Sequence, residues 1–245
     1  MKLVKYSEES VNIGDAMQTI ALKDFILSKY GVDINEYSDR KQMTEDDMII
    51  NGWQRHENEK LPENGIFIGI HSEFKKMTHI KNDTLIGCRD LFTLKEVNKI
   101  PHLKGIFSAC STCVIPTYNG PRKGKAEYLH CDVKTGFIPF DEQIKMARNL
   151  LEDLKTKELV TTDRLHIALP CIALGTPVIV KKRPYQRERY SLFDLVPGFI
   201  GFGRIIKSNS GVREYLSKMF TDSFEQIVVP HPNFQKLLND NKKTD

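Results

Sequence analysis

The apolar residues of this chain occur in short runs that end in polar or glycine-containing turns, and stretches with helical spacing follow several of them. Five runs in the first half predict strands, at residues 3–6, 48–50, 66–70, 84–86 and 105–107. The spacing at 16–30 and 90–98 predicts helices, and Gly31 is placed to stop the first of them. Strands that alternate with helices in this way indicate parallel βα units.

The apolar periodicity stops at residues 118–125, which are rich in glycine, proline and charge, and it restarts beyond them. The second half then predicts strands at 128–133, 158–161, 177–180 and 226–229, helices at 140–155 and 164–174, a stop at Gly175, and a helical tail at 233–245. We therefore predict an α/β fold of two Rossmann-like domains, residues 1–120 and 121–245, that face a cleft. Ligands of such sheets bind outside the carboxyl ends of the strands, so the residues after each strand are candidates for chemistry.

Composition and charge narrow the class of protein. The chain has 245 residues, of which 40% are hydrophobic and 28% charged, as in globular proteins. The net charge of +4 comes from charges that alternate in sign, apart from the basic run at 181–189, and this favours small anions over nucleic acid. No apolar run approaches the roughly 20 residues of a membrane span, and the first ten residues hold no apolar signal core. We therefore expect a cytoplasmic protein without a transmembrane segment.

The cysteines indicate reduced thiols, because they are five in number and lie mostly in apolar segments. Cys110 and Cys113 have the CxxC spacing of redox pairs and of half a zinc site. No second CxxC and no pair of histidines at zinc spacing accompanies them, so we expect no metal site and no cofactor. Redox or zinc chemistry at this pair is the alternative.

Residues 159–180 read as a strand, a polar turn, a helix, a glycine stop and a second strand. Thr162 or Asp163 is predicted to cap the helix, which places Arg164 and His166 in its first turn. A helix start attracts anions, so these two side chains form a candidate site for phosphate or carboxylate. The positive field lowers the pKa of the histidine and a bound anion raises it, which makes it a candidate proton donor or acceptor. The structural alternative is an ion pair for the arginine and a place in the interior for the histidine.

Four segments resemble motifs of the polysaccharide pyruvyl transferase family, and they occur in the family's order. They are residues 12–15 with Gln18 and 21–22, residues 49–53, residues 86–90 with Thr93, and residues 162–168 with 173–179. Residues 108–112 also resemble a turn of that family, with Ala109 where the family usually has glycine. The match spans residues 10–200, and the chain is short for the family.

The resemblance implies a fold similar to GT-B glycosyltransferases, phosphoenolpyruvate as the donor substrate and a pair of sugar hydroxyls as the acceptor. In the family the Arg-Leu-His segment and the arginine of the central motif contact the donor. These positions correspond to Arg164, Leu165 and His166, and to Arg89. The donor site would then lie mainly in the C-terminal domain and the acceptor side in the N-terminal domain. The implied reaction forms a pyruvate ketal on a glycan, or on a lipid-linked or nucleotide-linked sugar precursor, and releases phosphate.

Two arginines suit the phosphate and the carboxylate of this donor, because each can bind one of them with two hydrogen bonds. We expect His166 to be the general acid, and Asp15 to be the base or an acceptor ligand. Arg89 and Arg164 complete the expected catalytic set. The alternatives are a helix N-cap for Asp15 and a surface ion pair of Arg89 with Asp90 or Glu96.

Four residues of the N-terminal half are the candidates for acceptor binding: Asn12, Asp15, Gln18 and Trp53. Trp53 is the only tryptophan and would offer an aromatic platform for a sugar ring, with a core anchor as the alternative. The basic run at 181–189 would attract an anionic substrate, with a solvated loop as the alternative.

Two other functions stay open at this point. A GT-B-like glycosyltransferase with a nucleotide-sugar donor would need an acidic residue for the ribose in the second half, where Asp194 is the candidate. The other open function is that of a non-catalytic relative that binds a glycan or an anion, and the short length of the chain suggests it.

Overall fold

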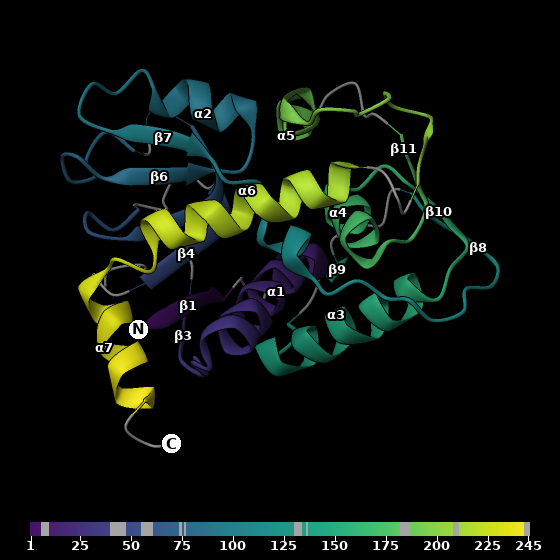
Figure 1. The fold of residues 1–245 in the computed structure, drawn as a ribbon, viewed down its shortest axis with the longest axis horizontal. Coiled ribbons are helices and arrows are strands. Elements are labelled where there is room, and N and C mark those ends of the chain that lie inside the picture. The colour runs from purple at the N-terminus through teal and green to yellow at the C-terminus, as the bar shows by residue number, and fades with distance from the viewer. Residues whose placement is uncertain are drawn as a thin grey trace.

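The computed structural model describes residues 1–5, 10–39, 48–54, 61–73, 75, 77–129, 134–135, 137–181, 187–207 and 211–242. It shows a mixed α/β protein in which helices connect parallel strands, consistent with a Rossmann-like fold. One sheet comes from the first half of the chain and a second sheet from the second half (Figure 1). No helix in these ranges combines the length and the apolar character that a membrane crossing requires.

Within the described ranges, the first sheet has six parallel strands in the order β3-β1-β4-β5-β6-β7. The strands are β1 (Lys2–Lys5), β3 (Tyr37–Asp39), β4 (Met48–Gln54), β5 (Ile66–Ser72), β6 (Leu85–Cys88) and β7 (Lys104–Phe107). The strand order reverses at β1, because β3 and β4 lie on its two sides. Such a switch point is where open α/β sheets bind ligands at the carboxyl ends of the strands. Helix α1 (Ile13–Tyr30) connects β1 to β3, and α2 (Leu91–Val97) connects β6 to β7.

The second sheet has the order β12-β11-β10-β8 in the described part of the chain, and β12 runs antiparallel to its neighbour. Its strands are β8 (Lys125–Tyr128), β10 (Leu159–Thr162), β11 (Val178–Val180) and β12 (Ile205–Ile206). Helices α3 (Phe140–Lys155), α4 (Leu165–Leu174) and α5 (Arg187–Tyr190) accompany this sheet. The 3₁₀ turn η3 (Ser111–Val114) precedes the sheet in the chain, and a second, η5 (Phe193–Leu195), follows α5. An antiparallel pair of short strands, β2 (Ser10–Val11) and β9 (Lys134–Thr135), joins the two halves.

Local signals explain where the helices begin and end. The Asn12 side chain caps α1 by accepting a hydrogen bond from the Gly14 N–H at 3.2 Å. Gly31 ends α1 with φ of 70° and Gly175 ends α4 with φ of 74°, the left-handed conformation that glycine adopts without strain. Both glycine stops confirm the expectation from the sequence. Asp90 caps α2 through its carboxylate.

Helix α4 has an irregular first turn. His166, its second residue, has φ of −84° and ψ of 18°, which is not helical. Pro170 lies four residues further on, and a proline lacks the N–H that would bond to the carbonyl of His166 and also crowds that carbonyl. The backbone of the histidine is therefore displaced from helical geometry by a residue one turn away.

Helix α6 (Gly211–Ile227) connects the two halves of the fold. In Figure 1 it runs from the side of α4 across to the first sheet, and it contacts β5, β6 and β7. Its Phe220 and Phe224 are fully buried in one core with Leu3 of β1 and Ile49 of β4. Helix α7 (Pro232–Asn241) follows and adds the buried Phe234 to that core. The first sheet is thus covered on one side by residues from the far end of the chain.

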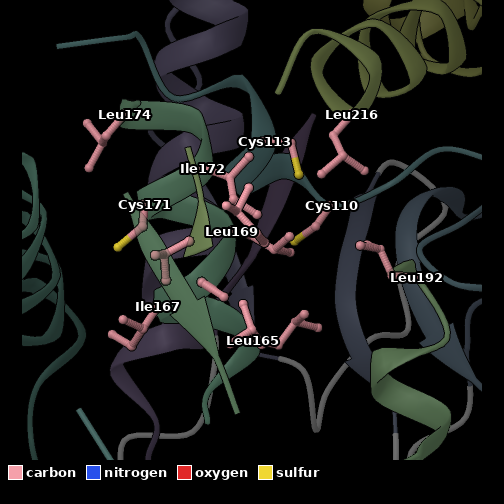
Figure 2. Packing of buried hydrophobic residues seen from close by; sticks show 14 of the residues in the cluster. Cys110, Cys113, Leu165, Ile167, Leu169, Cys171, Ile172, Leu174, Leu192 and Leu216 are labelled. Carbon is pink, nitrogen blue, oxygen red and sulfur yellow. The ribbon is translucent and has the colours of Figure 1, made fainter. Parts of the chain in front are cut away.

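Helix α4 is buried along its whole length between the second sheet and the elements around it. Figure 2 shows Leu165, Ile167 and Leu169 of α4 in the same core as Cys113 of η3 and Leu216 of α6. Because residues of both halves of the chain contribute to this core, the first turn of α4, which carries His166, is held against α1 and η3.

Ala109 adopts a left-handed backbone with φ of 56°. It is the residue that stands where the resembled family has glycine. A side chain with a Cβ pays roughly 1–2 kcal/mol for this conformation, so the turn after β7 carries strain. Ser108 supports the turn, because its hydroxyl accepts a hydrogen bond from the Gly69 N–H at 3.0 Å.

One predicted strand is wrong, and two others have different bounds in the structure. The strand expected at 226–229 is instead the end of α6 and the turn after it; the apolar residues of α6 recur every four positions, and this helical burial overrides the local preference of Val228 and Val229 for strand. The strand expected at 128–133 is β8, which ends at Tyr128, and residues 131–133 lie outside the described ones. The strand expected to end at residue 50 continues to Gln54, because an irregularity at Gly52 lets pairing with β5 resume.

Candidate functional site

The structure brings together side chains that follow strands of both sheets. Arg89 comes directly after β6, Arg164 follows β10 by two residues, and Asp15 lies in the first turn of α1. All three surround His166, the second residue of α4. Residues separated by up to 151 positions therefore form one cluster at the carboxyl ends of the strands, as the sequence analysis expected.

His166 is held between an arginine and an aspartate. Its Nε2 lies 3.5 Å from Nη1 of Arg89, and its Nδ1 lies 3.8 Å from Oδ1 of Asp15. Because a guanidinium only donates hydrogen bonds, Nε2 is the accepting nitrogen and the ring proton of the neutral form belongs on Nδ1, facing the carboxylate. Both His166 and Asp15 are buried, with exposed fractions of 5% and 6%.

The pKa of His166 lies well below its usual value. Burial is the largest cause, followed by the positive charges of Arg89, Arg189 and Arg164 and by His71. The imidazole is therefore neutral at pH 7 in the absence of a ligand. An anion that neutralised the arginines would raise its pKa again.

Arg89 is completely buried, which is rare for a charged side chain. Its Nε lies 3.4 Å from Oδ2 of Asp90, and its Nη1 reaches His166. Its Nη2 is buried and has no hydrogen-bond partner among the described residues. A buried donor without a partner is costly, so this guanidinium is placed to bind an acceptor that the described residues do not supply.

Asp90 connects Arg89 to a second buried histidine. Its Oδ2 lies 2.6 Å from Nδ1 of His71, and its Oδ1 accepts hydrogen bonds from the N–H and the hydroxyl of Thr93 at 2.9 Å each. Burial alone would raise the pKa of Asp90, but His71, Arg89 and the Thr93 N–H outweigh it and lower the pKa. The carboxylate therefore stays ionised and fixes the orientation of the arginine. Burial also lowers the pKa of His71, against the raising effect of Asp90.

Arg164 differs in position from the prediction. It is itself the N-cap residue of α4, whereas Thr162 and Asp163 precede the cap. The Thr162 hydroxyl accepts the Arg164 N–H at 3.0 Å, which turns the chain out of β10 before the helix begins. The Arg164 Nη2 donates to Oδ1 of Asn12 at 3.4 Å, so the starts of α1 and α4 are joined.

Gly14 and Gln18 position the residues around the histidine. A Cβ at Gly14 would lie 2.6 Å from Cβ of His166, so this close approach of α1 to α4 requires glycine. Gln18 is fully buried and donates from Nε2 to Oδ1 of Asp15 at 3.1 Å. The Cys110 thiol donates to Oε1 of the same amide at 3.5 Å. Asn12, not Asp15, is the N-cap of α1, so the capping alternative for Asp15 is wrong.

The other predicted residues take different places. Leu165 is buried in the hydrophobic core. The backbone of Trp53 pairs with His71 in the sheet, and its side chain lies outside the described part of the structure. Asp194 is exposed in η5. In the basic run at 181–189, residues 182–186 lie outside the described ones.

Cys110 and Cys113 are buried, free thiols, as are Cys88 and Cys171, while Cys131 lies outside the described residues. Burial raises the pKa of Cys113 well above its usual value, and Cys110 raises it further. A protonated, buried thiol is a poor nucleophile and a poor metal ligand. The described residues contain no group of three or more His, Cys, Asp or Glu side chains arranged to hold a metal ion.

Sequence reasoning missed two members of the cluster, His71 and Asp90, and it named Arg189 only as part of the basic run at 181–189. His71 could have been found, because it lies at the carboxyl end of β5 and parallel neighbours bring their carboxyl ends to one edge. Asp90 was read only as a surface partner of Arg89, whereas it is buried. Arg189 comes from the short helix α5, and no periodicity in the sequence indicates where that helix lies.

Comparison with known proteins shows the fold and no more. No protein-family model and no curated protein matches the chain. Among solved structures, a functionally uncharacterised protein of Klebsiella pneumoniae subsp. pneumoniae is similar, with a TM-score of 0.51 and 13% sequence identity over 79% of this chain and 87% of that chain. This likeness supports a Rossmann-like α/β fold that carries, in this chain, a buried cationic site around a histidine.

Proposed function

We propose that this protein is a pyruvyl transferase, which moves pyruvate from phosphoenolpyruvate to two hydroxyls of a sugar and releases phosphate. The observation that carries the proposal is the buried Arg89, whose Nη2 has no partner among the described residues while its Nη1 contacts His166. A buried cation of this kind favours a small anion with several acceptor oxygens. The motif resemblance supplies the identity of the donor.

The charges of the cluster fit such a donor. Arg89, Arg164 and Arg189 are cationic, Asp15 and Asp90 are anionic, and the neutral His166 adds nothing in the free protein. Phosphoenolpyruvate carries about three negative charges near neutral pH, since a phosphate monoester loses its second proton near pH 6. Binding would offset the arginines and raise the pKa of His166, so donor binding and protonation at its Nε2 are coupled.

His166 is the general acid in this proposal. Its Nε2 proton goes to C3 of the donor, whose methylene becomes a methyl group and whose C2 becomes electron-deficient. A sugar hydroxyl adds to C2 with loss of its proton, the C2–O bond to phosphate breaks, and a second hydroxyl adds to C2 with loss of its proton to close the ketal. Donor and diol thus give ketal and inorganic phosphate, with protons conserved.

Asp15 has a supporting part in this chemistry. Its Oδ1 faces Nδ1 of His166 at 3.8 Å and is held by Gln18. A carboxylate in that place fixes the ring tautomer and stabilises the imidazolium, as in other aspartate–histidine pairs. It leaves Nε2 as the nitrogen that exchanges protons with the donor.

The proposal includes a two-domain, GT-B-like arrangement with the site between residues 1–120 and 121–245. Its support is the meeting of Arg89 and Asp15 from the first half with Arg164 and His166 from the second. It also includes a cytoplasmic location, where phosphoenolpyruvate is available, and a glycan or activated sugar precursor as the acceptor.

The test is acceptor-dependent release of phosphate from phosphoenolpyruvate over a panel of glycosides. Arg89→Met and His166→Ala should each lower turnover by about 10²–10³-fold, as expected for removal of a preorganised charge or a general acid. Arg148→Met is the matched control, because Arg148 is an exposed arginine paired with Asp24 outside the cluster. Unchanged turnover in the two site variants would contradict the proposal.

Ligand binding separates the rival functions. Saturating donor at ~100 Kd should stabilise the protein by about 2.7 kcal/mol, which thermal unfolding detects. Stabilisation by nucleotide sugars and not by phosphoenolpyruvate would favour a glycosyltransferase. Stabilisation by phosphoenolpyruvate without phosphate release over the whole panel would favour a non-catalytic binding protein.

A further inference from the structure

Arg189 brings a third guanidinium to the cluster from the basic run at 181–189, for which the sequence left open attraction of an anionic substrate or a solvated loop. Both residues after it are tied to the site. The Tyr190 hydroxyl donates to the carbonyl of Asp163, and the Ser191 hydroxyl accepts the Phe92 N–H at 3.0 Å. Residues 190–191 at the end of α5 therefore link the start of α2 to the turn before α4. Figure 1 shows α5 beside α2.

These two anchors place Arg189 between the arginines already described. Asp163 directly precedes Arg164, and Phe92 lies three residues after Arg89. The electrostatics agree with this position, because the Arg189 charge lowers the pKa of both His166 and His71. Burial, and next the charge of Arg89, lower the pKa of Arg189 itself to about 10, so it remains cationic at pH 7.

We propose that Arg189 is a third anion ligand of this site and binds one of the two anionic groups of the donor, an inference that rests on the proposed function. The charge balance gives the reason. Without Arg189, the positive charges of Arg89 and Arg164 equal the negative charges of Asp15 and Asp90. Arg189 adds a positive charge to these four groups, and it offers a third forked donor to a ligand that carries two separate anionic groups.

The experiment measures Kd for phosphoenolpyruvate and for inorganic phosphate by titration calorimetry. Arg189→Gln should weaken phosphoenolpyruvate binding about 10- to 100-fold, the loss expected for one charge-assisted contact, and Arg189→Lys should fall in between. The dependence of Kd on salt should also become shallower in Arg189→Gln. Lys181→Gln is the control, because Lys181 belongs to the same basic run but is exposed and paired with Glu127.

A second readout needs no ligand. The groups that act on His166 are Asp15, Arg89, Arg164, Arg189 and His71, so Arg189→Gln should raise the pKa of His166 in a titration followed by nuclear magnetic resonance. An unchanged pKa of His166, once folding is confirmed by circular dichroism, would show that the Arg189 charge does not reach the cluster and would overturn the inference. Arg189→Lys serves where the glutamine variant does not fold.

The outcomes separate this inference from the proposed function. If the wild type binds phosphoenolpyruvate and a folded Arg189→Gln binds it equally well, the role of Arg189 is wrong and the proposed function stands. If the wild type binds neither phosphoenolpyruvate nor phosphate, the proposed function fails and the role of Arg189 fails with it.

Discussion

Nη1 of Arg89 lies 3.5 Å from Nε2 of His166, so a fully buried cation faces a buried imidazole before any ligand is present. This contact joins a residue after β6 to a residue at the start of α4. It makes the protonation of the histidine depend on what neutralises the arginine. The free protein should therefore resist protonation at the centre of its site.

Stability should fall as the pH drops below about 6.5, the usual pKa of histidine in an unfolded chain. The pKa of His166 is lowered in the folded protein, chiefly by burial and by Arg89, so the unfolded chain binds the proton more readily. The contribution of the neutral His166 to stability is fully present above that pH, and it is lost as the pH falls toward the pKa that His166 has in the folded protein. Urea unfolding at pH 7.5, 6.5 and 5.5 measures this loss.

The control for this prediction is His166→Asn, which removes the titrating group and keeps a polar side chain. Its loss of stability between pH 7.5 and 5.5 should be smaller than in the wild type. A remaining slope is expected, because burial also lowers the pKa of His71. Identical slopes in the two proteins would show that His166 is not held neutral by folding.

Gly14→Ala should disturb the site directly. The new Cβ would lie 2.6 Å from Cβ of His166, and overpacking of this kind typically costs about 1–3 kcal/mol. Donor affinity should fall with stability, because α1 carries Asp15 and Asn12. Chemical unfolding and calorimetry measure the two effects. Gly211→Ala is the control, since a Cβ there meets nothing within 4 Å. Equal stability and donor affinity in the two variants would contradict the close approach of α1 to α4.

Ala109→Gly should stabilise the protein by about 0.5–1 kcal/mol. The left-handed backbone at Ala109 costs roughly 1–2 kcal/mol, which glycine would avoid. Glycine also has more conformational freedom in the unfolded chain, and this offsets part of the stabilisation. Thermal unfolding with Ala173→Gly for comparison tests this, because Ala173 lies inside α4 and the same exchange there should destabilise. A loss of stability in Ala109→Gly would show that the turn is not strained.

Phe220→Ala should cost about 3–5 kcal/mol, because the ring is fully buried against the first sheet and packs edge-on to Phe25 at 5.7 Å. Lys218 lies on the exposed face of α6, two residues before Phe220, so Lys218→Ala should change stability by less than about 0.5 kcal/mol. Denaturant unfolding compares the two. A small effect of Phe220→Ala would mean that α6 does not complete the core of the first sheet.

The sequence predicted the elements whose signals are local. The helix at 140–155 agrees with α3 at both ends, and the stops at Gly31 and Gly175 are as expected, because caps and amphipathic spacing depend on nearby residues. Helix α6 was not predicted, and its end was taken for a strand. Its burial depends on partners such as Leu3, more than 200 residues away, which no local pattern contains.

The site shows the same division. His166, Arg164, Arg89 and Asp15 could be named because each follows a strand or begins a helix, and the structure brings them together. Three other features depend on tertiary packing: the burial of Asp90, the position of Arg189 on α5 beside the site, and the contact of Gly14 with His166.

The return of α6 onto the first sheet has a consequence for how the protein is made. The core of that sheet includes Phe220 and Phe224, so the strands of the first sheet cannot reach their final packing while the ribosome is still adding the residues before α6. The apolar face of the first sheet therefore stays exposed until α6 has left the ribosome. Folding during synthesis is therefore expected to finish in one late step for both halves, and chaperones that shield nascent chains would act on this protein before residue 211 appears.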